Sequence, residues 1–337
     1  MVIKQKAIAE KAGVSCATVS RALNNSTNVK PETIAKIHKA MEELGLNSPF
    51  KNQFINMNKA TNYVLIVVGD NTDIFFSRII KGICDNLFSL SLIPVLCVSN
   101  FDTDIEAWHI KHANAANYAG IIIITAVESE SFVNLLKTIT IPVILVNRYI
   151  RSFDTDVVCI DNYRGGYIAA STLIKAGHRK ILHLTGDRNS TPCQDRLRGF
   201  IDAMTDANLK LHPEEIYYGD FTIEDGRRFV DKYFTRDSSY TAIYIGNNPM
   251  AFGAASRLTE LGYKIPDDVS IICFDDSPLV ERGNFKLTSI SYDPCSMGHA
   301  AVEVLQKRLA NPNAEKMKII FSPNTIERGS IKNINAF

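Results

Sequence analysis

The residues with the most distinctive spacing lie near the amino terminus, where the chain reads AGVSCATVSR over residues 12–21. Gly13 permits a sharp turn after one helix, and Ser15 can cap the next helix by accepting a hydrogen bond from a free backbone N–H. Small, hydroxyl and guanidinium side chains on that second helix suit contacts with phosphates and base edges. This pattern predicts a helix-turn-helix whose second helix lies in the major groove of DNA.

Apolar residues around this motif predict a three-helix core. Those expected on the first two helices are Ile8, Ala9, Ala12, Val19 and Leu23. A third helix is expected from Pro31, because Ile34, Ile37, Met41 and Leu44 follow at spacings of three and four. An ordinary helical pair with a solvated polar face is the alternative interpretation of this segment.

Charge is unevenly distributed along the chain. Residues 1–60 contain nine Lys or Arg and four Asp or Glu, whereas the whole chain carries a formal net charge of +1. The amino-terminal segment is therefore basic and the remainder is mildly acidic. Such a division favours contact with nucleic-acid phosphates by one domain only.

Composition limits the remaining classes of protein. A chain of 337 residues allows a small head and a large body. The sequence has no signal-peptide pattern, no apolar run long enough to span a membrane, and seven scattered Cys without a CxxC pair, so reduced thiols and a cytoplasmic location are expected. His109 and His112 have helical spacing but no Cys or carboxylate cluster beside them, so no metal is expected. No cofactor or enzymatic activity is expected, because GxGxxG, GxxxxGKS/T, GxSxG and HExxH are absent from the sequence.

The composition changes after Leu44. Residues 46–61 are rich in Asn and lack an apolar period, which is typical of a linker. Beyond them, short apolar runs alternate with helical stretches, and this pattern predicts an α/β body with parallel sheets. The number of runs favours two doubly wound lobes over a single sheet. The expected strands are 63–68, 92–98, 120–125, 141–146, 157–160, 180–184, 242–245 and 269–274.

Polar residues recur just after these runs, at the strand ends where ligands bind in such sheets. They are Asp70-Asn71, Asn147-Arg148, Asp161-Asn162, Gly186-Asp187-Arg188, Asn247-Asn248 and Asp275-Asp276. Each could equally cap the helix that follows it. Carboxylates, amides and arginines that converge beside Phe75 and Phe221 suit a hydroxylated ring, because polar groups bind its hydroxyls and aromatic rings cover its C–H faces.

These motifs resemble the LacI/GalR family of bacterial repressors over nearly the whole chain. Besides the amino-terminal motif, the matching segments include GHRKI at 177–181, RLRGF at 196–200, FDD at 274–276, LTSI at 287–290 and RGS at 328–330. The resemblance implies a three-helix helix-turn-helix domain at 1–46, a hinge or linker at 47–61, and a two-lobed periplasmic-binding-protein-like body at 62–337. The N-lobe would span about 62–161 and 293–320, and the C-lobe about 162–292 and 321–337. It also implies a homodimer that binds a roughly palindromic operator in double-stranded DNA under the control of a small-molecule effector.

Carried over by position, the resemblance assigns effector-binding residues on both lobes. Arg196 would donate paired hydrogen bonds, unless it forms a helix-surface salt bridge, and Asp275 would accept hydrogen bonds from hydroxyls. His178 and Asp276 are more consistent with structural roles. The expected effector-binding residues are Asp73, Phe75, Phe76, Arg148, Arg196, Phe221, Asn247 and Asp275.

The resemblance also assigns DNA-binding residues, which are Ser15, Cys16, Ala17, Thr18, Ser20, Arg21, Asn24 and Ile55. Ala17 can touch a thymine methyl and Arg21 is the candidate for a guanine contact, whereas the hydroxyl side chains suit phosphates. Ile55 falls where relatives insert a leucine into the minor groove. The linker otherwise departs from the family pattern, which leaves open whether it folds into a hinge helix on DNA.

The expected function is therefore that of a DNA-binding transcriptional regulator, with a repressor favoured, whose effector is a sugar or a sugar derivative. Arg148 and Arg188 would receive the phosphate if the effector is a sugar phosphate. A purine-type effector stacked on Phe75, Phe76 and Phe221, or a corepressor, is the alternative. A solute-binding protein is the alternative outside the regulators, and the DNA-binding head argues against it.

Overall fold

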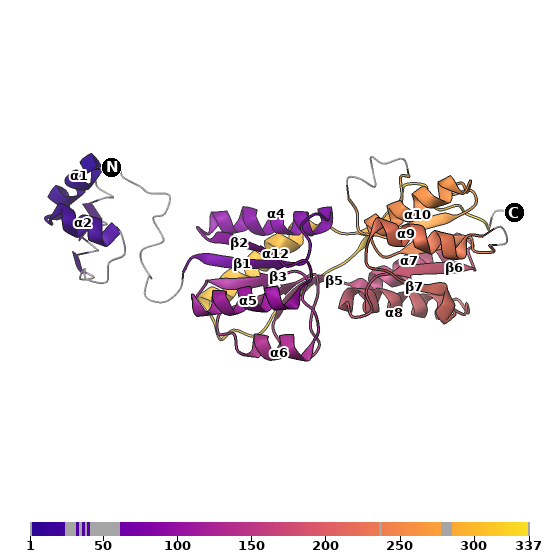
Figure 1. Ribbon diagram of the computed structural model, residues 1–337, viewed down its shortest axis with the longest axis horizontal. Helices are drawn as coiled ribbons and strands as arrows, with labels where there is room; N and C mark the ends of the chain where they lie inside the picture. Colours follow the sequence, from indigo (N-terminus) through magenta and orange to yellow (C-terminus); the bar gives the residue numbers. More distant parts are fainter. Residues whose placement is uncertain are drawn as a thin grey trace. The chain divides into compact units, whose positions relative to one another are not determined.

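The computed structural model describes residues 2–23, 32–33, 36–37, 39–40, 61–235, 238–277 and 285–335. The chain divides into two compact units, Met1–Lys59 and Ala60–Phe337, which we call the head and the body and describe separately (Figure 1). Most of the predicted third helix, the linker, and the predicted DNA contacts Asn24 and Ile55 lie outside the described residues.

The head begins with the two helices that the motif predicts. The first, α1, spans Val2–Ala12, and the second, α2, spans Cys16–Leu23. Gly13 has a φ of +66°, a left-handed conformation that glycine adopts without strain, so the chain can reverse between the helices. Residues 32–33, 36–37 and 39–40 are also helical. The predicted apolar seam is confirmed for its described side chains, and the core consists of Ile8, Ala9, Val19 and Ile37, with Ala12 and Val14 packed beside it.

Within the described residues, the body contains two six-stranded sheets. The first has the order β11-β5-β4-β3-β1-β2, and all its neighbouring strands are parallel. The second has the order β12-β10-β9-β8-β6-β7 and is parallel except where β12 pairs with β10. The strands of the first sheet are β1 (Tyr63–Val68), β2 (Ile93–Val98), β3 (Gly120–Ile123), β4 (Val143–Val146), β5 (Asp156–Ile160) and β11 (Lys318–Phe321). Those of the second are β6 (Ile181–Thr185), β7 (Ile216–Tyr218), β8 (Ala242–Ile245), β9 (Ser270–Phe274), β10 (Thr288–Ser291) and β12 (Asn324–Ile326).

Helices cover both faces of each sheet, so each sheet with its helices forms one lobe of the body. In the N-lobe, α4 and α12 enclose one apolar core against the first sheet, and α5 and α6 enclose the other (Figure 1). In the C-lobe, α9 and α10 cover one face of the second sheet, and α7 and α8 cover the opposite face. The N-lobe helices are α4 (Ile74–Ser89), α5 (Thr103–Ala115), α6 (Glu130–Lys137) and α12 (Pro294–Ala310). Those of the C-lobe are α7 (Asn162–Lys175), α8 (Thr191–Asp206), the 3-10 turn η1 (Pro213–Glu215), α9 (Ile223–Tyr233) and α10 (Asn248–Glu260).

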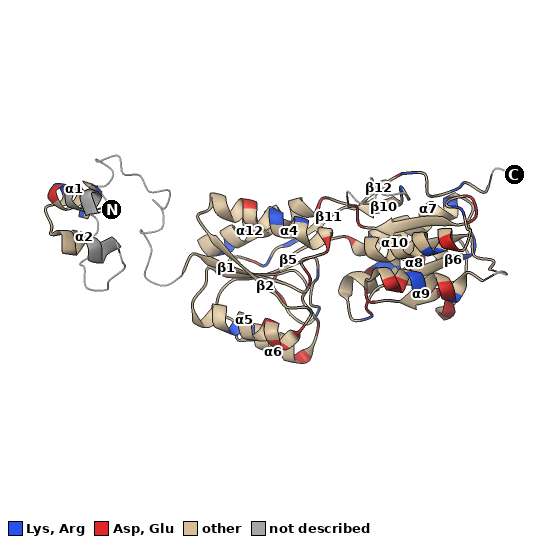
Figure 2. Ribbon diagram, turned by 45° about the horizontal axis from the view of Figure 1, so that its top comes forward, with Lys and Arg blue, Asp and Glu red and all other residues tan. Residues whose placement is uncertain are grey.

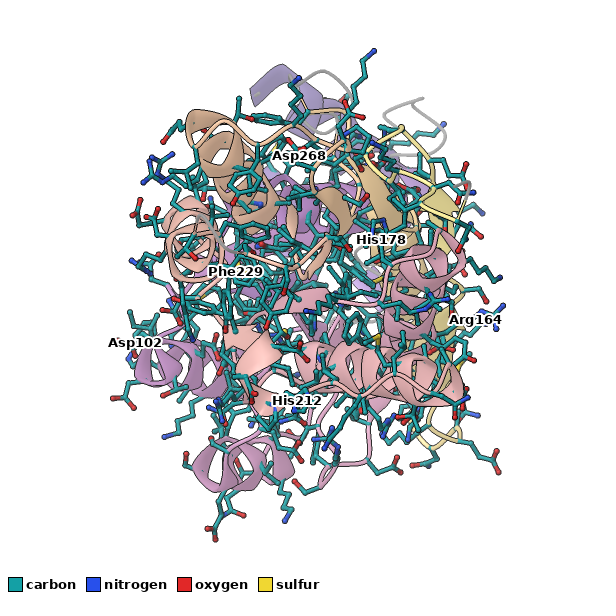
Figure 3. The ribbon with its side chains drawn as sticks, turned by 90° about the vertical axis from the view of Figure 1, so that its right-hand side faces the viewer. Asp102, Arg164, His178, His212, Phe229 and Asp268 are labelled. Atoms are coloured by element: carbon teal, nitrogen blue, oxygen red, sulfur yellow. The ribbon has the colours of Figure 1, made fainter. Side chains whose placement is uncertain are left out.

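The inner and outer faces of these helices differ in polarity. Phe229, on the inner face of α9, is fully buried in the C-lobe core (Figure 3), whereas the outer faces of α9 and α10 carry charges that pair across the two helices (Figure 2). The Arg227–Glu260 and Arg257–Asp231 pairs have N–O distances of 2.7 and 2.6 Å. No described helix is both long enough and apolar enough to cross a membrane.

The eight predicted strands are all present, with ends that differ by a few residues. The sequence pattern did not predict β7, β10, β11 and β12 as strands. The case of β10 is instructive, because its sequence TSIS has no apolar run and yet all its residues are buried. Its hydroxyl groups are satisfied by polar partners instead: the Ser289 Oγ, for example, donates to Asp276 at 3.0 Å.

Helices α7 and α8 approach one another closely at glycines. On α7, a Cβ added at Gly166 would lie 2.0 Å from the carbonyl oxygen of Arg196 on α8. A Cβ added at Gly199 on α8 would lie 1.9 Å from the carbonyl oxygen of Tyr163 on α7. Because real Cβ atoms do not approach this closely, only glycine permits this crossing, and the crossing fixes the position of α8.

We expect Gly166→Ala to destabilise the body by about 1–3 kcal/mol, because the added methyl must push α8 away from α7. The clash costs more than the roughly 1 kcal/mol of helix propensity that alanine gains over glycine, so the net effect on stability is a loss. Denaturant unfolding of the purified protein measures the change. Ser171→Ala, at a partly exposed position of the same helix, is the control, and equal unfolding midpoints for the two variants would contradict the prediction.

Candidate functional site

The exposed start of α2 is the candidate surface of the head. The Ser15 Oγ accepts a hydrogen bond from the Thr18 N–H at 3.1 Å, so the predicted cap is confirmed. The Thr18 hydroxyl lies 2.8 Å from the same oxygen, and Cys16 and Ala17 are exposed beside it. Ser20 and Arg21 lie on α2, but their side chains are not among those described. The described part is a short, largely uncharged surface that can approach the edge of a base pair closely.

In the body, a cavity of about 400 Å³ opens at the carboxyl ends of β1, β4, β8 and β9. The eight predicted effector-binding residues all line it: Asp73, Phe75, Phe76, Arg148, Arg196, Phe221, Asn247 and Asp275. They come from both lobes, and we call this cavity the cleft. Its position agrees with the rule that ligands bind beyond the carboxyl ends of parallel strands.

Arg196 is the most firmly positioned polar side chain of the cleft. Its Nε donates to the Asn162 Oδ1 at 2.8 Å, and its Nη1 donates to the Gly246 carbonyl oxygen at 2.7 Å. The guanidinium also lies 3.4 Å from the centroid of the Phe274 ring. Arg196 is 5% exposed and forms no ion pair with a described residue, so the alternative of a surface salt bridge is excluded. The N–H groups that remain can donate to a ligand.

Asp275 supplies an acceptor on the same side of the cleft. Its backbone has a φ of +68°, and its carboxyl follows β9 directly. Burial is the main cause that raises the pKa of Asp275 to about 7; Arg196 opposes the rise, and the carboxylates of Asp73 and Asp276 add to it. The protein groups around Asp275 therefore hold this carboxyl partly protonated near neutral pH.

The neighbouring Asp276 has a different role. Its carboxylate pairs with Arg328 at 2.8 Å and accepts a hydrogen bond from the Ser289 hydroxyl. This confirms the structural role expected for Asp276, although the partner is a distant arginine rather than the next helix. His178 is also structural, because its ring nitrogens lie 2.9 Å from the Thr241 hydroxyl and 3.2 Å from the Lys332 carbonyl oxygen (Figure 3).

The three predicted aromatic residues contribute apolar surface to the cleft. Phe75 and Phe76 meet edge to face, with ring centroids 5.4 Å apart. Phe221 has a φ of +65° and packs its ring where a Cβ on Gly186 would otherwise stand. These rings can cover the apolar faces of a bound ring.

Two predicted residues have hydrogen bonds to the protein itself. Asp73 caps α4 by accepting from the Phe75 N–H at 2.8 Å, and burial raises its pKa. Asn247 caps α10 through the Met250 N–H and donates to the Phe221 carbonyl oxygen at 3.1 Å. Asn247 therefore positions Phe221, and only its remaining hydrogen-bonding capacity is available to a ligand.

Sequence reasoning did not identify every residue that lines the cleft. Phe101 lies at the end of β2 with a φ of +62°, and its ring occupies the space beside Gly69. Cys193 lines the cleft from the first turn of α8. Cys193 could have been predicted from the sequence, because it lies three residues before Arg196 on the same helix and so shares a face with it. Arg188, the suggested phosphate partner, does not line the cleft, because its guanidinium stacks 3.7 Å from the centroid of the Tyr218 ring.

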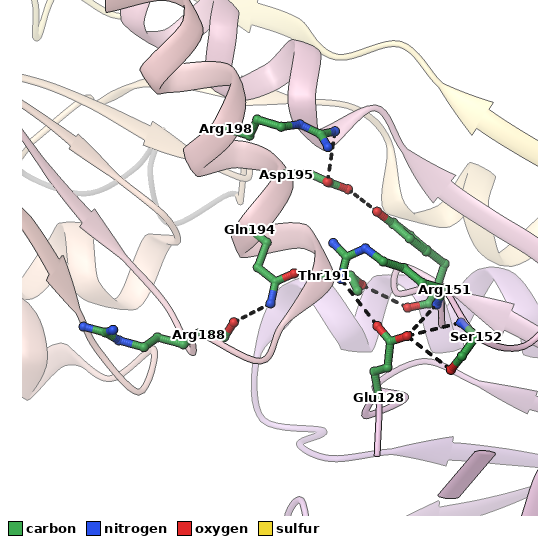
Figure 4. Close-up of polar contacts among 9 residues, drawn as sticks. Glu128, Arg151, Ser152, Arg188, Thr191, Gln194, Asp195 and Arg198 are labelled. Carbon is green, nitrogen blue, oxygen red and sulfur yellow. Dashed lines mark hydrogen bonds and ion pairs between the residues drawn. The ribbon is translucent and has the colours of Figure 1, made fainter. Parts of the chain in front are cut away.

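A hydrogen-bonded bridge joins the two lobes beside the cleft (Figure 4). The Tyr149 hydroxyl donates to the Asp195 carboxylate at 2.8 Å, and the Thr191 hydroxyl donates to the Tyr149 carbonyl oxygen at 3.1 Å. Burial, with the hydrogen bond to Asp195, raises the pKa of Tyr149 to about 12, so the phenol remains a donor. Beyond this bridge lies a second groove of about 520 Å³, which includes Phe153, Tyr163 and Ile320.

The described residues contain no group of three or more His, Cys, Asp or Glu side chains that could hold a metal ion. The His112 ring stacks on Trp108, with ring centroids 5.4 Å apart.

Comparisons with known proteins agree with this geometry. Residues 5–47 match the profile described as "Bacterial regulatory proteins, lacI family", and residues 170–331 match a periplasmic binding protein-like domain. The chain is 30% identical to the HTH-type transcriptional repressor PurR of Vibrio vulnificus over 331 residues, which cover 98% of this chain and 99% of the relative. The chain belongs to the lacI family of bacterial regulatory proteins.

Solved structures show the same fold. A complex of the transcriptional regulator CelR with cellobiose has a TM-score of 0.75 at 24% identity, covering 97% of this chain and 99% of that one. A LacI family regulator from Enterococcus faecium with bound ribose has a TM-score of 0.72 at 25% identity, covering 81% and 99%. The relatives are transcriptional regulators. This lacI-family member is accordingly a DNA-binding transcriptional regulator with an effector-binding body.

We expect Asp275→Asn to stabilise the ligand-free protein in a pH-dependent way. The raised pKa of Asp275 means that the folded state keeps a proton which the unfolded state releases, so the stability of the natural protein falls as the pH rises from about 4 to 7. The asparagine side chain does not titrate, so the variant escapes this loss. Its free energy of unfolding, relative to that of the natural protein, should rise by at most about 3 kcal/mol between pH 5 and pH 8.

Denaturant unfolding at the two pH values measures the difference. Asp276→Asn is the matched control, since it breaks the ion pair with Arg328 and should lower stability at both pH values. An Asp275→Asn variant that is no more stable than the natural protein at pH 8 would contradict the account of the buried carboxyl.

Proposed function

We propose that the cleft binds a sugar or a sugar derivative and that this ligand controls binding of the head to DNA. The observation that carries the proposal is the fixed Arg196 guanidinium, which shares one cavity with the Asp275 carboxyl and with four phenyl rings. A guanidinium and a carboxyl together can serve adjacent hydroxyls as donor and acceptor. The cellobiose and ribose complexes of structurally similar regulators support the same class of ligand.

A purine-type effector is the second candidate. It is favoured by Phe75, Phe76 and Phe221, whose rings could stack on a planar base. The sugar is preferred because four carboxyl groups line the cleft, those of Asp70, Asp73, Asp220 and Asp275, and these acceptors suit several hydroxyl donors. Whether the ligand releases or strengthens DNA binding follows from which arrangement of the lobes it stabilises.

We expect Arg196→Lys to weaken effector binding about tenfold or more, because lysine keeps the charge but loses the paired N–H groups, which are worth roughly 1.5–3 kcal/mol. Calorimetric titration with a panel of pentoses, hexoses, disaccharides and purine bases measures this effect. Arg188→Lys, at an exposed arginine outside the cleft, is the matched control. Binding of a purine base, with no binding of any sugar, would contradict the proposed ligand class.

For the head, we propose that α2 enters the major groove of operator DNA. Cys16 and Ala17 would supply apolar contacts, Ser15, Thr18 and Ser20 would meet phosphates, and Arg21 would read a guanine. Asn24 would extend this surface, and Ile55 would enter the minor groove. We assign the protein to the cytoplasm, where DNA is accessible and its seven free cysteines stay reduced.

We further propose a homodimer formed through the β2 edge of the N-lobe. Phe88 is 86% exposed at the end of α4, and Leu96 is 45% exposed on β2. Within the described residues, β2 is the last strand of its sheet, so its outer edge lacks a paired strand. A second copy of the chain would cover this apolar edge and place two heads on a two-fold symmetric operator.

We expect Arg21→Ala to lose discrimination at one position of each half-site, because a paired Arg–guanine contact is worth about 1–3 kcal/mol. Selection of bound genomic fragments followed by footprinting should give two symmetric half-sites for the natural protein. Lys11→Ala serves as a charge-loss control on α1. If Arg21→Ala kept the full sequence preference of the natural protein, the assignment of Arg21 to a base would be wrong.

A further inference from the structure

The groove beyond the Tyr149–Asp195 bridge is a second cavity between the lobes, and it is separate from the cleft. Its volume of about 520 Å³ falls within the roughly 300–1,000 Å³ that small-molecule sites occupy. The groove and the cleft share no lining residue. A ligand of the groove is therefore additional to the effector of the cleft.

Both lobes contribute to the groove through segments close to the bridge. The N-lobe supplies β5, β11 and the loop after β4, and the C-lobe supplies the start of α7 and one face of α8. Arg148 and Arg196 line the cleft, whereas their chain neighbours Tyr149 and Asp195 line the groove. The bridge thus lies between the two cavities, so a ligand in either one contacts residues that adjoin it.

Apolar and aromatic side chains line the groove from both lobes. Cys159 of β5 is buried, whereas Ile320 of β11 is 59% exposed. The Tyr149 and Phe153 rings come from the N-lobe and the Tyr163 ring from the C-lobe. Such a lining suits a planar ring, because aromatic side chains stack on its faces or meet its edges.

Most charged groups of the groove already have protein partners (Figure 4). The Asp195 carboxylate holds the bridge and also pairs with Arg198 at 3.2 Å. The Asp161 carboxylate accepts a hydrogen bond from a backbone N–H at the start of α7, and Arg151 pairs with Glu128 at 3.4 Å. These groups therefore have little capacity left for a ligand of opposite charge.

Lys318 differs from them. It is exposed on β11, and within the part of the chain that the structure describes its ammonium group forms no ion pair or hydrogen bond. The Arg198 side chain is 63% exposed and lies 5.1 Å from the centroid of the Tyr163 ring, so its guanidinium is also accessible. Against these two cations stands the exposed carboxylate of Asp154. The balance of accessible charge favours an anionic ligand group.

We propose that the groove is a second ligand site, which binds a small aromatic carboxylate with its ring among the aromatic side chains and its carboxylate at Lys318 and Arg198. The ligand contacts both ends of the Tyr149–Asp195 bridge, so it stabilises the arrangement of the lobes in which the groove is formed. Binding in the groove and binding in the cleft are then coupled, and each ligand changes the affinity for the other by the same factor. The site itself does not depend on the identity of the effector.

Calorimetric titration of the full chain with benzoate, 4-hydroxybenzoate and indole-3-acetate tests the site. Benzyl alcohol and 4-hydroxybenzyl alcohol are the neutral counterparts, benzylamine carries the opposite charge, and cyclohexanecarboxylate keeps the charge without the aromatic ring. We expect at least one aromatic carboxylate to bind about three- to fivefold more tightly than its neutral counterpart, the range that an exposed ion pair supports. High salt should reduce this preference, because it screens exposed charges.

Variants at exposed positions separate the site from general effects of charge and stability. Lys318→Gln should remove most of the preference for the carboxylate, whereas Lys316→Gln, at an exposed lysine outside the groove, should keep it. Ile320→Ser should weaken binding of every aromatic probe. Ile223→Ser is its control, at an isoleucine of α9 that is similarly exposed. Melting temperatures establish that each variant is folded.

Hydrogen–deuterium exchange locates the bound carboxylate. Slower exchange is expected at residues 150–163 and 318–320, and it should exceed any change at residues 73–76. Protection centred on residues 73–76 instead would show that the probes enter the cleft.

Other outcomes would also overturn the proposal. They are no binding of any aromatic carboxylate, equal binding of carboxylates and alcohols, tighter binding of benzylamine, and equal binding of cyclohexanecarboxylate. If Ile320→Ser lowered the mass of the assembly without any ligand, the groove would be an interface between copies of the chain. An unchanged sugar affinity in saturating carboxylate would overturn the coupling. Sugar binding in the cleft is measured separately, so its failure is distinguishable from failure of the groove.

Discussion

The close crossing of α7 and α8 is the constraint on which the effector site depends. Gly166 and Gly199 admit backbone carbonyls at distances that no side chain could tolerate. This contact brings Arg196 beside Asn162 at the start of α7, where the amide fixes the guanidinium. The same crossing sets the position of the first turn of α8 on the cleft wall. One helix pair therefore positions both Arg196 and the first turn of α8 on the cleft wall, so this part of the cleft is built on rigid elements.

The cleft contains polar groups in unfavourable environments. Asp275 is buried enough for its pKa to reach about 7, and the Arg148 Nε is buried without a partner. A ligand that supplies hydrogen-bond donors and acceptors at these groups would relieve both penalties, so part of its binding energy would come from the site itself. Because the ligand contacts both lobes, it also adds to the Tyr149–Asp195 bridge that joins them. A ligand can control DNA binding only if it stabilises one arrangement of the lobes more than the other.

The sequence predicted the site better than it predicted the complete sheets. The carboxyl ends of parallel strands converge, so polar residues after Val146 and Phe274 were expected to meet, and the family resemblance added residues such as Arg196 on α8; all eight predicted residues line one cavity. By contrast, β10 has no apolar run, and its burial depends on hydroxyl partners far away in the chain. The partners of Asp276 and Arg188 were equally inaccessible to local reasoning, because Arg328 and Tyr218 reach them only in the folded body.

The most direct test of the account is hydrogen–deuterium exchange of the full chain, with and without the sugar that binds most tightly in titration. The account predicts slower exchange at residues 73–76, 147–148 and 247–250 and in the first turn of α8, since these segments line the cleft. Protection confined to residues 150–163 and 318–320, which line the groove beyond the Tyr149–Asp195 bridge, would contradict it. That result would move the effector site to the opposite side of the bridge.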